Sequence, residues 1–349
     1  MLIANYILWL VLPVSSFFLP KRYKFHILLI MTVFSATFVC ITQDTTLNKD
    51  REAYINIINA FVNDGLMLMD PGLIVLVKIL SVKFSGETLY TSFFLVTVLL
   101  SVTLKMILFH RYGGVLFGCL MMYFSYYFLT QEMTVIRAGL AIGLLYFSWF
   151  SWIKEEKKLY YLFGLLATTV HISSVAFLLA PYMLSHHNSW RWRGLLSLFF
   201  AMILANFLRN QWLFDFISLV AELTGFEKIN AYIMLLEDEV FSKISFIRLL
   251  PHILIMAIYF YYQKKWHGDI ITAMLIRIQT VGILTFLAFS TFPVFSYRLS
   301  DLFLFSNIFL IGRLRYLLSA SLYYHFVVFY TGCIIFYTIN FSGLYSSNF

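Results

Sequence analysis

Residues 2–24 read LIANYILWLVLPVSSFFLPKRYK, an apolar run followed directly by the basic cluster Lys21-Arg22-Tyr23-Lys24. The run is close to the length that an α-helix needs to cross the hydrocarbon core of a membrane. Short loops rich in Lys and Arg stay in the cytoplasm, so this segment predicts a first membrane helix with its N-terminus outside. A secretory signal has its basic residues before the apolar run. Here they follow it, and we predict that the helix is retained.

Further basic clusters punctuate the chain in the same way, each between apolar stretches. They are His110-Arg111, Lys154–Lys158, Arg191-Trp192-Arg193, Lys264-Lys265 and Arg313-Leu314-Arg315. If all are cytoplasmic, an even number of helices lies between neighbouring clusters, and the apolar runs then give about 12 crossings. The prediction is an all-α polytopic integral membrane protein with a single transmembrane domain over residues 1–349.

The composition agrees with this class, since 61% of the 349 residues are hydrophobic and only 12% are charged. A soluble domain carries about 25% charged residues. Most of the net charge of +8 lies in the basic clusters, where it orients the protein and meets anionic lipid headgroups, so no nucleic-acid partner is predicted. The three cysteines lack paired spacing and the histidines are dispersed, so neither a disulfide nor a metal site is predicted.

The parity of the crossings places two long segments outside, residues 43–87 and 209–244. Within the first, residues 70–84 are apolar but too short to span and carry two lysines, which predicts an amphipathic helix at the membrane interface. A short turn over residues 130–133 is also predicted to face outside, directly before a helix that carries Arg137.

Between Lys158 and Arg191 the chain must cross twice within about 30 residues, which is short for two spans. The polar stretch 168–174 is the predicted break in this interval. It would place His171 at the outer apex of a tight hairpin of short helices. One uninterrupted helix is the alternative.

Several arginines lie at or near the predicted outer boundary, where the loop-charge bias and the cost of burial both disfavour them. They are Arg51, Arg137, Arg209, Arg248 and Arg298, with His171 and His252 beside them. Guanidinium is a rigid, permanently charged fork suited to phosphate and pyrophosphate. The pattern therefore predicts an anionic ligand at this face, such as the diphosphate headgroup of a lipid.

Each of these residues also has a purely structural explanation. Arg51 could form ion pairs with its acidic neighbours, including Asp50, and Tyr54 follows it at helical spacing. Arg137 could extend to the interface or pair with Glu132. His171 could satisfy backbone groups of the hairpin.

The same holds for the arginines late in the chain. Arg298 and Asp301 are three residues apart and could form a salt bridge within one helix. Arg248 and His252 share a helix face, but Pro251 lies between them, so a kink could explain both.

Four short motifs, taken in order, resemble the EpsG/Wzy-type bacterial polysaccharide polymerases, a family that includes O-antigen polymerases. They are Asp50-Arg51-Glu52-Ala53-Tyr54, Ile136-Arg137-Ala138-Gly139-Leu140-Ala141, His171-Ile172-Ser173-Ser174 and Tyr297-Arg298-Leu299-Ser300-Asp301. Together they span most of the chain. The family often has glutamine where this chain has Ala138, which removes side-chain hydrogen bonding there but leaves the arginine in place.

The resemblance implies a membrane glycosyltransferase with a GT-C-like fold. The dispersed histidines and the lack of a compact carboxylate cluster predict metal-independent chemistry, and no cofactor is predicted. Such an enzyme moves a growing glycan from undecaprenyl diphosphate onto the next lipid-linked repeat unit, at the periplasmic face of the bacterial inner membrane. The implied partners are the lipid-linked oligosaccharides that act as donor and acceptor, membrane lipid and, as a further candidate, a chain-length regulator.

Site residues follow from the resemblance together with the chemistry of the side chains. Arg51, Arg137 and Arg298 are the candidate diphosphate clamp, because preorganised cations stabilise charge on a departing diphosphate. His171 is the candidate base for the acceptor hydroxyl, with Asp50 as the alternative. The secondary candidates are Tyr54, Arg248, His252 and Asp301.

Other functions stay open on the sequence. A flippase or transporter of the same lipid-linked sugars would be expected to carry related halves or polar residues at the membrane midplane, whereas charge here lies toward one face. A polysaccharide ligase shares the donor chemistry, and a membrane acyltransferase also uses His and Arg. A structural membrane subunit would leave the external arginines unexplained.

Overall fold

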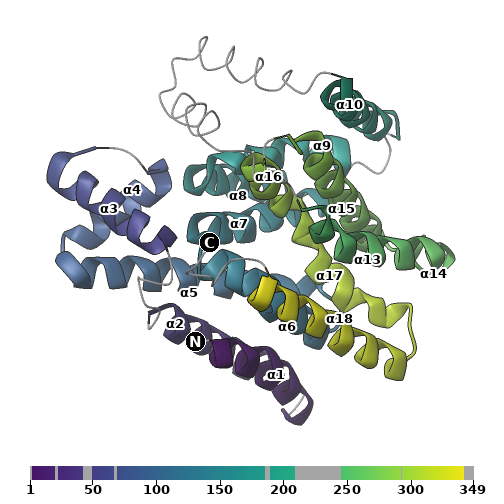
Figure 1. Ribbon diagram of the computed structural model, residues 1–349, viewed down its shortest axis with the longest axis horizontal. Helices are drawn as coiled ribbons and strands as arrows, with labels where there is room; N and C mark the ends of the chain where they lie inside the picture. The colour runs from purple at the N-terminus through teal and green to yellow at the C-terminus, as the bar shows by residue number, and fades with distance from the viewer. Residues whose placement is uncertain are drawn as a thin grey trace. The chain divides into compact units, whose positions relative to one another are not determined.

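The computed structural model describes residues 2–19, 23–41, 49–66, 69–184, 189–208, 245–291 and 293–341. Every regular element in these ranges is helical, as the sequence predicts, and none of them contains a strand (Figure 1). The predicted external segment 209–244 lies outside the described residues, and so does Arg209. The chain divides into two compact units, the first formed by Met1–Leu178 with Ile308–Phe349 and the second by Leu179–Asn307.

The first unit contains most of the helices. They are α1 (Leu2–Phe18), α2 (Lys24–Ile41), α3 (Lys49–Asp64), α4 (Pro71–Ser81), α5 (Gly86–Tyr112), α6 (Leu116–Met122), the π-helix η2 (Tyr123–Glu132), α7 (Ile136–Ile153), α8 (Lys157–Val170), the 3-10 helix η5 (Leu314–Tyr316) and α18 (Ala320–Phe341).

The second unit contains a smaller set of helices. They are α9 (Ala180–Met183), α10 (Ser189–Leu208), the 3-10 helix η4 (Phe246–Leu249), α13 (Leu250–Tyr261), α14 (Gln263–Trp266), α15 (Ile270–Ala288) and α16 (Pro293–Leu304). Two elements cross the boundaries between the units, the 3-10 helix η3 (Ile172–Leu179) and α17 (Ser306–Arg313).

Four of the described helices are long and apolar enough to cross a membrane, which places this chain among membrane proteins. They are Gly86–Tyr112, Ile136–Ile153, Ile270–Ala288 and Ala320–Asn340. Shorter apolar helices such as Tyr6–Ser16 and Phe25–Phe34 fall where other crossings are predicted. The total of about 12 crossings, which rests on apolar run length and loop charge, stays a prediction, as does the side on which each loop lies.

The core of the first unit forms where α5 and α7 pack closely together. Gly143 of α7 allows the approach, because a Cβ atom there would lie only 3.3 Å from the Cβ of Leu104 on α5. Aromatic rings fill the space beside these helices. The rings of Tyr112 and Phe150 stack with their centroids 3.8 Å apart and their planes 6° apart. Rings of this size dominate the burial of apolar area in such a core.

The connection between α6 and α7 differs from the prediction. Residues 130–133 are predicted to form a turn, but α6 continues into the π-helix η2, which ends only at Glu132. The chain then turns over residues 133–135, where the backbone N–H of Val135 donates to the carbonyl oxygen of Thr130 at 3.1 Å. The prediction is wrong because polar residues such as Gln131 and Glu132 are typical of an exposed turn. In the π-helix their side chains are buried, so the helix continues through them.

Helix α4 corresponds to the predicted amphipathic segment 70–84. Its residues Leu73 and Val77 are buried, and the helix packs against α5 and α8. Gly72 allows the contact with α8, since a Cβ atom there would lie 2.8 Å from Oγ1 of Thr169. The placement of α4 at a membrane interface stays a prediction.

The helix break predicted within residues 168–174 is confirmed. Helix α8 ends at Val170, and His171 has an extended backbone with φ −154° and ψ 114°. Beyond it the chain folds back on α8, because the carbonyl oxygen of Phe177 accepts a hydrogen bond from the hydroxyl of Tyr160 at 3.0 Å. An uninterrupted helix is therefore excluded, while the two crossings of the membrane stay a prediction.

The link between α5 and α6 depends on a close contact between backbones. The backbone N–H of Val115 donates to the carbonyl oxygen of Gly312 on α17 at 3.1 Å. A Cβ atom on Gly312 would meet the carbonyl oxygen of Gly113 and would lie 3.0 Å from that of Val115. The carbonyl of Val115 is held in place, because it accepts the backbone N–H of Gly118 at 3.1 Å.

Gly312→Ala is therefore expected to destabilise the protein by about 1–3 kcal/mol, the usual cost of overpacking a tight contact. Thermal unfolding of the detergent-solubilised protein measures this loss. Gly332→Ala is the matched control, because its Cβ would lie 3.7 Å from the ring of Trp9 in ordinary contact. Equal melting temperatures for the two variants would show that the backbone around Gly312 can accommodate a Cβ atom.

Candidate functional site

Arg137 stands in the first turn of α7 and is held by two residues from distant parts of the chain. Its Nη1 donates to Oδ2 of Asp70 at 3.0 Å, and its Nε donates to the hydroxyl of Tyr54 at 3.1 Å. The guanidinium carbon also lies 5.3 Å from the centre of the Tyr54 ring. The guanidinium is therefore fixed in direction by one carboxylate and one phenol.

The carboxylate partner of Arg137 corrects an expectation from the sequence. Glu132 is the nearby acid in sequence, but Asp70 makes the ion pair with Arg137, whereas Glu132 bonds to Lys105. Asp70 lies directly before α4 and was not among the predicted site residues. The available signal was an acid followed by Pro71 at the start of an apolar helix, a position where Asp is favoured as a cap.

Arg51 lies beside this group on α3. Its guanidinium carbon is 4.7 Å from the centre of the Phe94 ring on α5, a cation–π contact. The Tyr54 ring meets the same Phe94 ring edge-on, with the centroids 6.2 Å apart. Arg51 and Tyr54 are one helical turn apart and therefore use one aromatic side chain as a common support. Asp50 lies in the same helix, and its side chain is outside what the structure describes.

The bend at His171 lies near this group, because the end of α8 contacts the start of α4. Thr169 lies against Gly72, two residues after Asp70, so the end of α8 meets the start of α4. His171 is half-buried. The first unit therefore brings three of the predicted residues, Arg51, Tyr54 and Arg137, around α3 and α7, with the His171 bend beside the start of α4.

The exposure of the ion pair leaves it accessible. The side chain of Arg137 is 23% exposed and that of Asp70 is 10% exposed. An anion can reach such a guanidinium, and partial burial strengthens the interaction because the surroundings screen charge less than water does.

The candidates in the second unit form a separate arrangement. Nη2 of Arg248 lies 2.7 Å and 2.6 Å from the two carboxylate oxygens of Asp301, and its guanidinium carbon lies 4.6 Å from the centre of the Tyr297 ring. Asp301 therefore has Arg248 of η4 as its partner, and the pairing with Arg298 expected within α16 stays a prediction. Arg298 is exposed on α16, and its part in a diphosphate clamp stays a prediction.

His252 lies in the interior of the second unit. Its Nδ1 is 2.7 Å from Nε2 of Gln279, and Oε1 of Gln279 accepts a hydrogen bond from the hydroxyl of Ser306 at 2.5 Å. His252 is only 5% exposed, so its bond to Gln279 serves as a contact between α13 and α15. Pro251 occupies the first turn of α13, which is where a proline begins a helix without kinking it.

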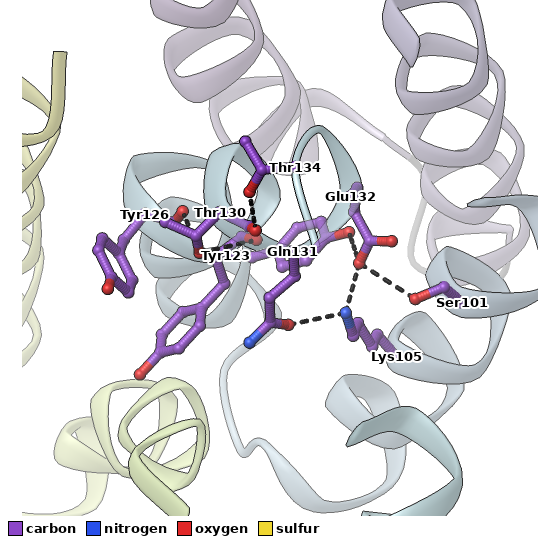
Figure 2. Close-up of polar contacts among 9 residues, drawn as sticks. Ser101, Lys105, Tyr123, Tyr126, Thr130, Gln131, Glu132 and Thr134 are labelled. Carbon is purple, nitrogen blue, oxygen red and sulfur yellow. Dashed lines mark hydrogen bonds and ion pairs between the residues drawn. The ribbon is translucent and has the colours of Figure 1, made fainter. Parts of the chain in front are cut away.

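A second polar cluster in the first unit was missed by the sequence reasoning. Lys105 of α5 is fully buried and pairs with Glu132, the last residue of η2 (Figure 2). Lys105 also donates to Oε1 of Gln131 at 2.8 Å. The signal was a lone lysine inside the long apolar run of residues 88–109, because an ionisable residue within a membrane helix marks a functional candidate by default.

Metal ligands do not gather in the part of the chain that the structure describes, where no three His, Cys, Asp or Glu side chains form a group. Cys119 is buried and Cys333 is exposed, and both are free thiols. Metal independence itself stays a prediction.

Comparison with known proteins adds one finding. A family model described as the EpsG family matches residues 26–349, nearly the whole chain. No curated protein and no solved structure matches the chain at a significant level. The GT-C-like fold therefore stays a prediction.

Proposed function

Because this chain belongs to the EpsG family, a family related to the Wzy-type polymerases, we propose that it polymerises undecaprenyl-diphosphate-linked repeat units into a surface polysaccharide. Membership in the family supports a polymerase-like role in polysaccharide biosynthesis at a membrane. The proposal adds the substrate, the glycosyl transfer and the location, which is the periplasmic face of the bacterial inner membrane.

One observation carries the proposal, the fixed guanidinium of Arg137. Asp70 and Tyr54 hold it at 3.0 Å and 3.1 Å while part of its side chain stays exposed. Arg51 lies on the neighbouring face of α3, supported by Phe94. Arginine is the side chain best suited to a diphosphate, because its planar fork can bond two oxygens at once.

These arginines would act on the leaving group. The acceptor hydroxyl oxygen forms a bond to the anomeric carbon of the donor glycan, while the bond from that carbon to the diphosphate oxygen breaks. The electron pair leaves with the lipid diphosphate, whose negative charge increases. Cations that are already oriented stabilise this charge without reorganising, which is the usual source of the largest catalytic effect.

The proton of the acceptor hydroxyl needs a base within hydrogen-bond reach. His171 is the proposed base, because the extended backbone at this residue ends α8 beside the start of α4, close in the chain to Thr169 and its contact with Gly72. Asp50 stays the alternative base. Asp70 is a weaker candidate, because its carboxylate already bonds to Arg137.

The proposal is tested on surface polysaccharide from cells that lack this protein. Wild-type protein is expected to restore a ladder of polymer lengths, whereas the null is expected to carry single repeat units only. Arg51→Ala is expected to lower the amount of polymer by about tenfold or more, because it removes one cation from the proposed diphosphate site. Polysaccharide gels measure both effects.

Glu52→Ala is the matched control, since Glu52 is an exposed neighbour on the same helix and is expected to leave the ladder unchanged. Loss of even the single-unit band in the null would contradict polymerisation and would favour a flippase or a ligase. A full ladder from correctly inserted Arg51→Ala would remove Arg51 from the site.

A further inference from the structure

We propose that Lys105 and Glu132 are positioning residues for Arg137, an inference that rests on the proposed function. Their buried ion pair fixes the end of η2, and α7 with its arginine starts from that end. Neither residue reaches the ligand. Their role is to hold the first turn of α7 at the place where Asp70 and Tyr54 can orient the guanidinium.

The ion pair is the centre of a compact hydrogen-bond network (Figure 2). Oε1 of Glu132 pairs with Lys105 and also accepts from the hydroxyls of Ser101 at 3.1 Å and Tyr123 at 3.0 Å. Lys105 donates in addition to Oε1 of Gln131 at 2.8 Å. One lysine of α5 therefore bonds to the last two residues of η2.

The end of η2 is in direct contact with the start of α7. A Cβ atom on Gly139 would lie 3.0 Å from the carbonyl oxygen of Gln131, so α7 rests on the backbone of the residue that Lys105 bonds. The intervening turn is closed by the bond from the Val135 N–H to the Thr130 carbonyl oxygen at 3.1 Å. Arg137 therefore follows Glu132 through a short segment with fixed geometry.

Stability alone does not account for this network. Burying two charges costs more than the pair returns in many proteins, and well-packed hydrophobic replacements of similar volume are often neutral or stabilising. The network also leaves Nε2 of Gln131 buried with no acceptor among the described residues. An arrangement that is costly in these ways, at the end of a π-helix, is typical of a site where geometry matters for function.

The test removes both charges together, because removal of one would leave the other buried without the opposite charge of its partner. Lys105→Met with Glu132→Gln keeps the size of both side chains and leaves an amide oxygen for Ser101 and Tyr123. We expect it to fold with a melting temperature no lower than that of the wild type. Glycan extension is measured in membranes that contain the variant, with the cells' own lipid-linked repeat units as substrate. Its rate is expected to fall about tenfold or more, because a small displacement of a binding group lowers the rate by this factor.

A double-mutant cycle distinguishes positioning from a general structural role. In an Arg137→Lys background the same pair of substitutions is expected to lower the rate less than twofold, because residues that act through one another are not additive. If Arg137→Lys alone abolishes extension, Tyr54→Phe serves as the background, since it removes the hydroxyl that accepts the hydrogen bond from Nε of Arg137. Equal losses in both backgrounds would overturn the inference, and so would a wild-type rate or a lowered melting temperature.

Thr97→Val is the matched control. Thr97 is buried on α5, and its hydroxyl bonds to the carbonyl oxygen of Phe93 within the same helix at 2.7 Å. It is expected to extend glycan at the wild-type rate. A polymer ladder in cells that lack the protein would contradict the proposed function itself. If the null loses the ladder while the uncharged pair keeps the wild-type rate, only the positioning role is lost.

Discussion

Arg137→Ala is expected to lower the rate of glycan extension by about 10²–10³-fold, the usual effect of removing one preorganised donor from a site where negative charge develops. The physical reason is that Asp70 and Tyr54 hold this guanidinium in one direction, so it can stabilise the developing charge without reorganising. The rate is measured in membranes that contain equal amounts of inserted protein. Arg137→Lys keeps the charge but loses the planar fork, and an intermediate rate is expected.

The control for this prediction is Arg315→Ala. Arg315 is also an arginine near a helix end, where its Nη1 donates to the carbonyl oxygen of Leu318 at 3.2 Å. Its removal leaves Arg313 in the same basic cluster, so orientation in the membrane is expected to be kept. A wild-type rate from Arg137→Ala would exclude Arg137 from the proposed diphosphate site. A loss in both variants alike would indicate an effect of charge on insertion.

Lys105→Met alone is expected to destabilise the protein by about 3–5 kcal/mol, because it leaves the Glu132 carboxylate buried without its cation. Addition of Glu132→Gln to the same chain is expected to restore the stability of the wild type. Thermal unfolding in detergent measures both variants against the wild type. The comparison needs no substrate, so it holds whichever glycan the protein handles.

The outcome that contradicts this prediction is a double variant as unstable as the single one. The lysine would then stabilise the fold through its packing, with no special dependence on the charge of Glu132. An unaffected single variant would mean that water or another group reaches the carboxylate in the membrane-embedded protein.

Helical class and the position of the break were predictable because they depend on local properties. Apolar runs predict the helices, and the basic loops mark where one helix ends and the next begins. The polar stretch around His171 ends α8 where the sequence predicts a break. Arg51 and Tyr54 share one side of α3 because three residues make almost one helical turn. The order of the four motifs also gave the family, which the match over residues 26–349 shows.

Ion-pair partners were not predictable, because they depend on which helices pack together. Arg137 lies 67 positions from its partner Asp70, and Glu132, the closer acid in sequence, is turned toward α5 by the π-helix. Lys105 could have been singled out as a charge in an apolar helix, but its partner could not. A single extra residue per turn rotates the following side chains to another face, and no local pattern in this sequence announces that change.

The sequence by itself therefore determined that this chain is a helical membrane protein of the EpsG family, and it predicted that arginines bind a diphosphate. Only the tertiary structure decided that Asp70 and Tyr54 orient Arg137, and that a buried pair of charges lies behind it. The physical reason is range. Hydrophobic periodicity and loop charge act within a helix or a loop, whereas the choice of a charged partner follows from packing between segments far apart in the chain.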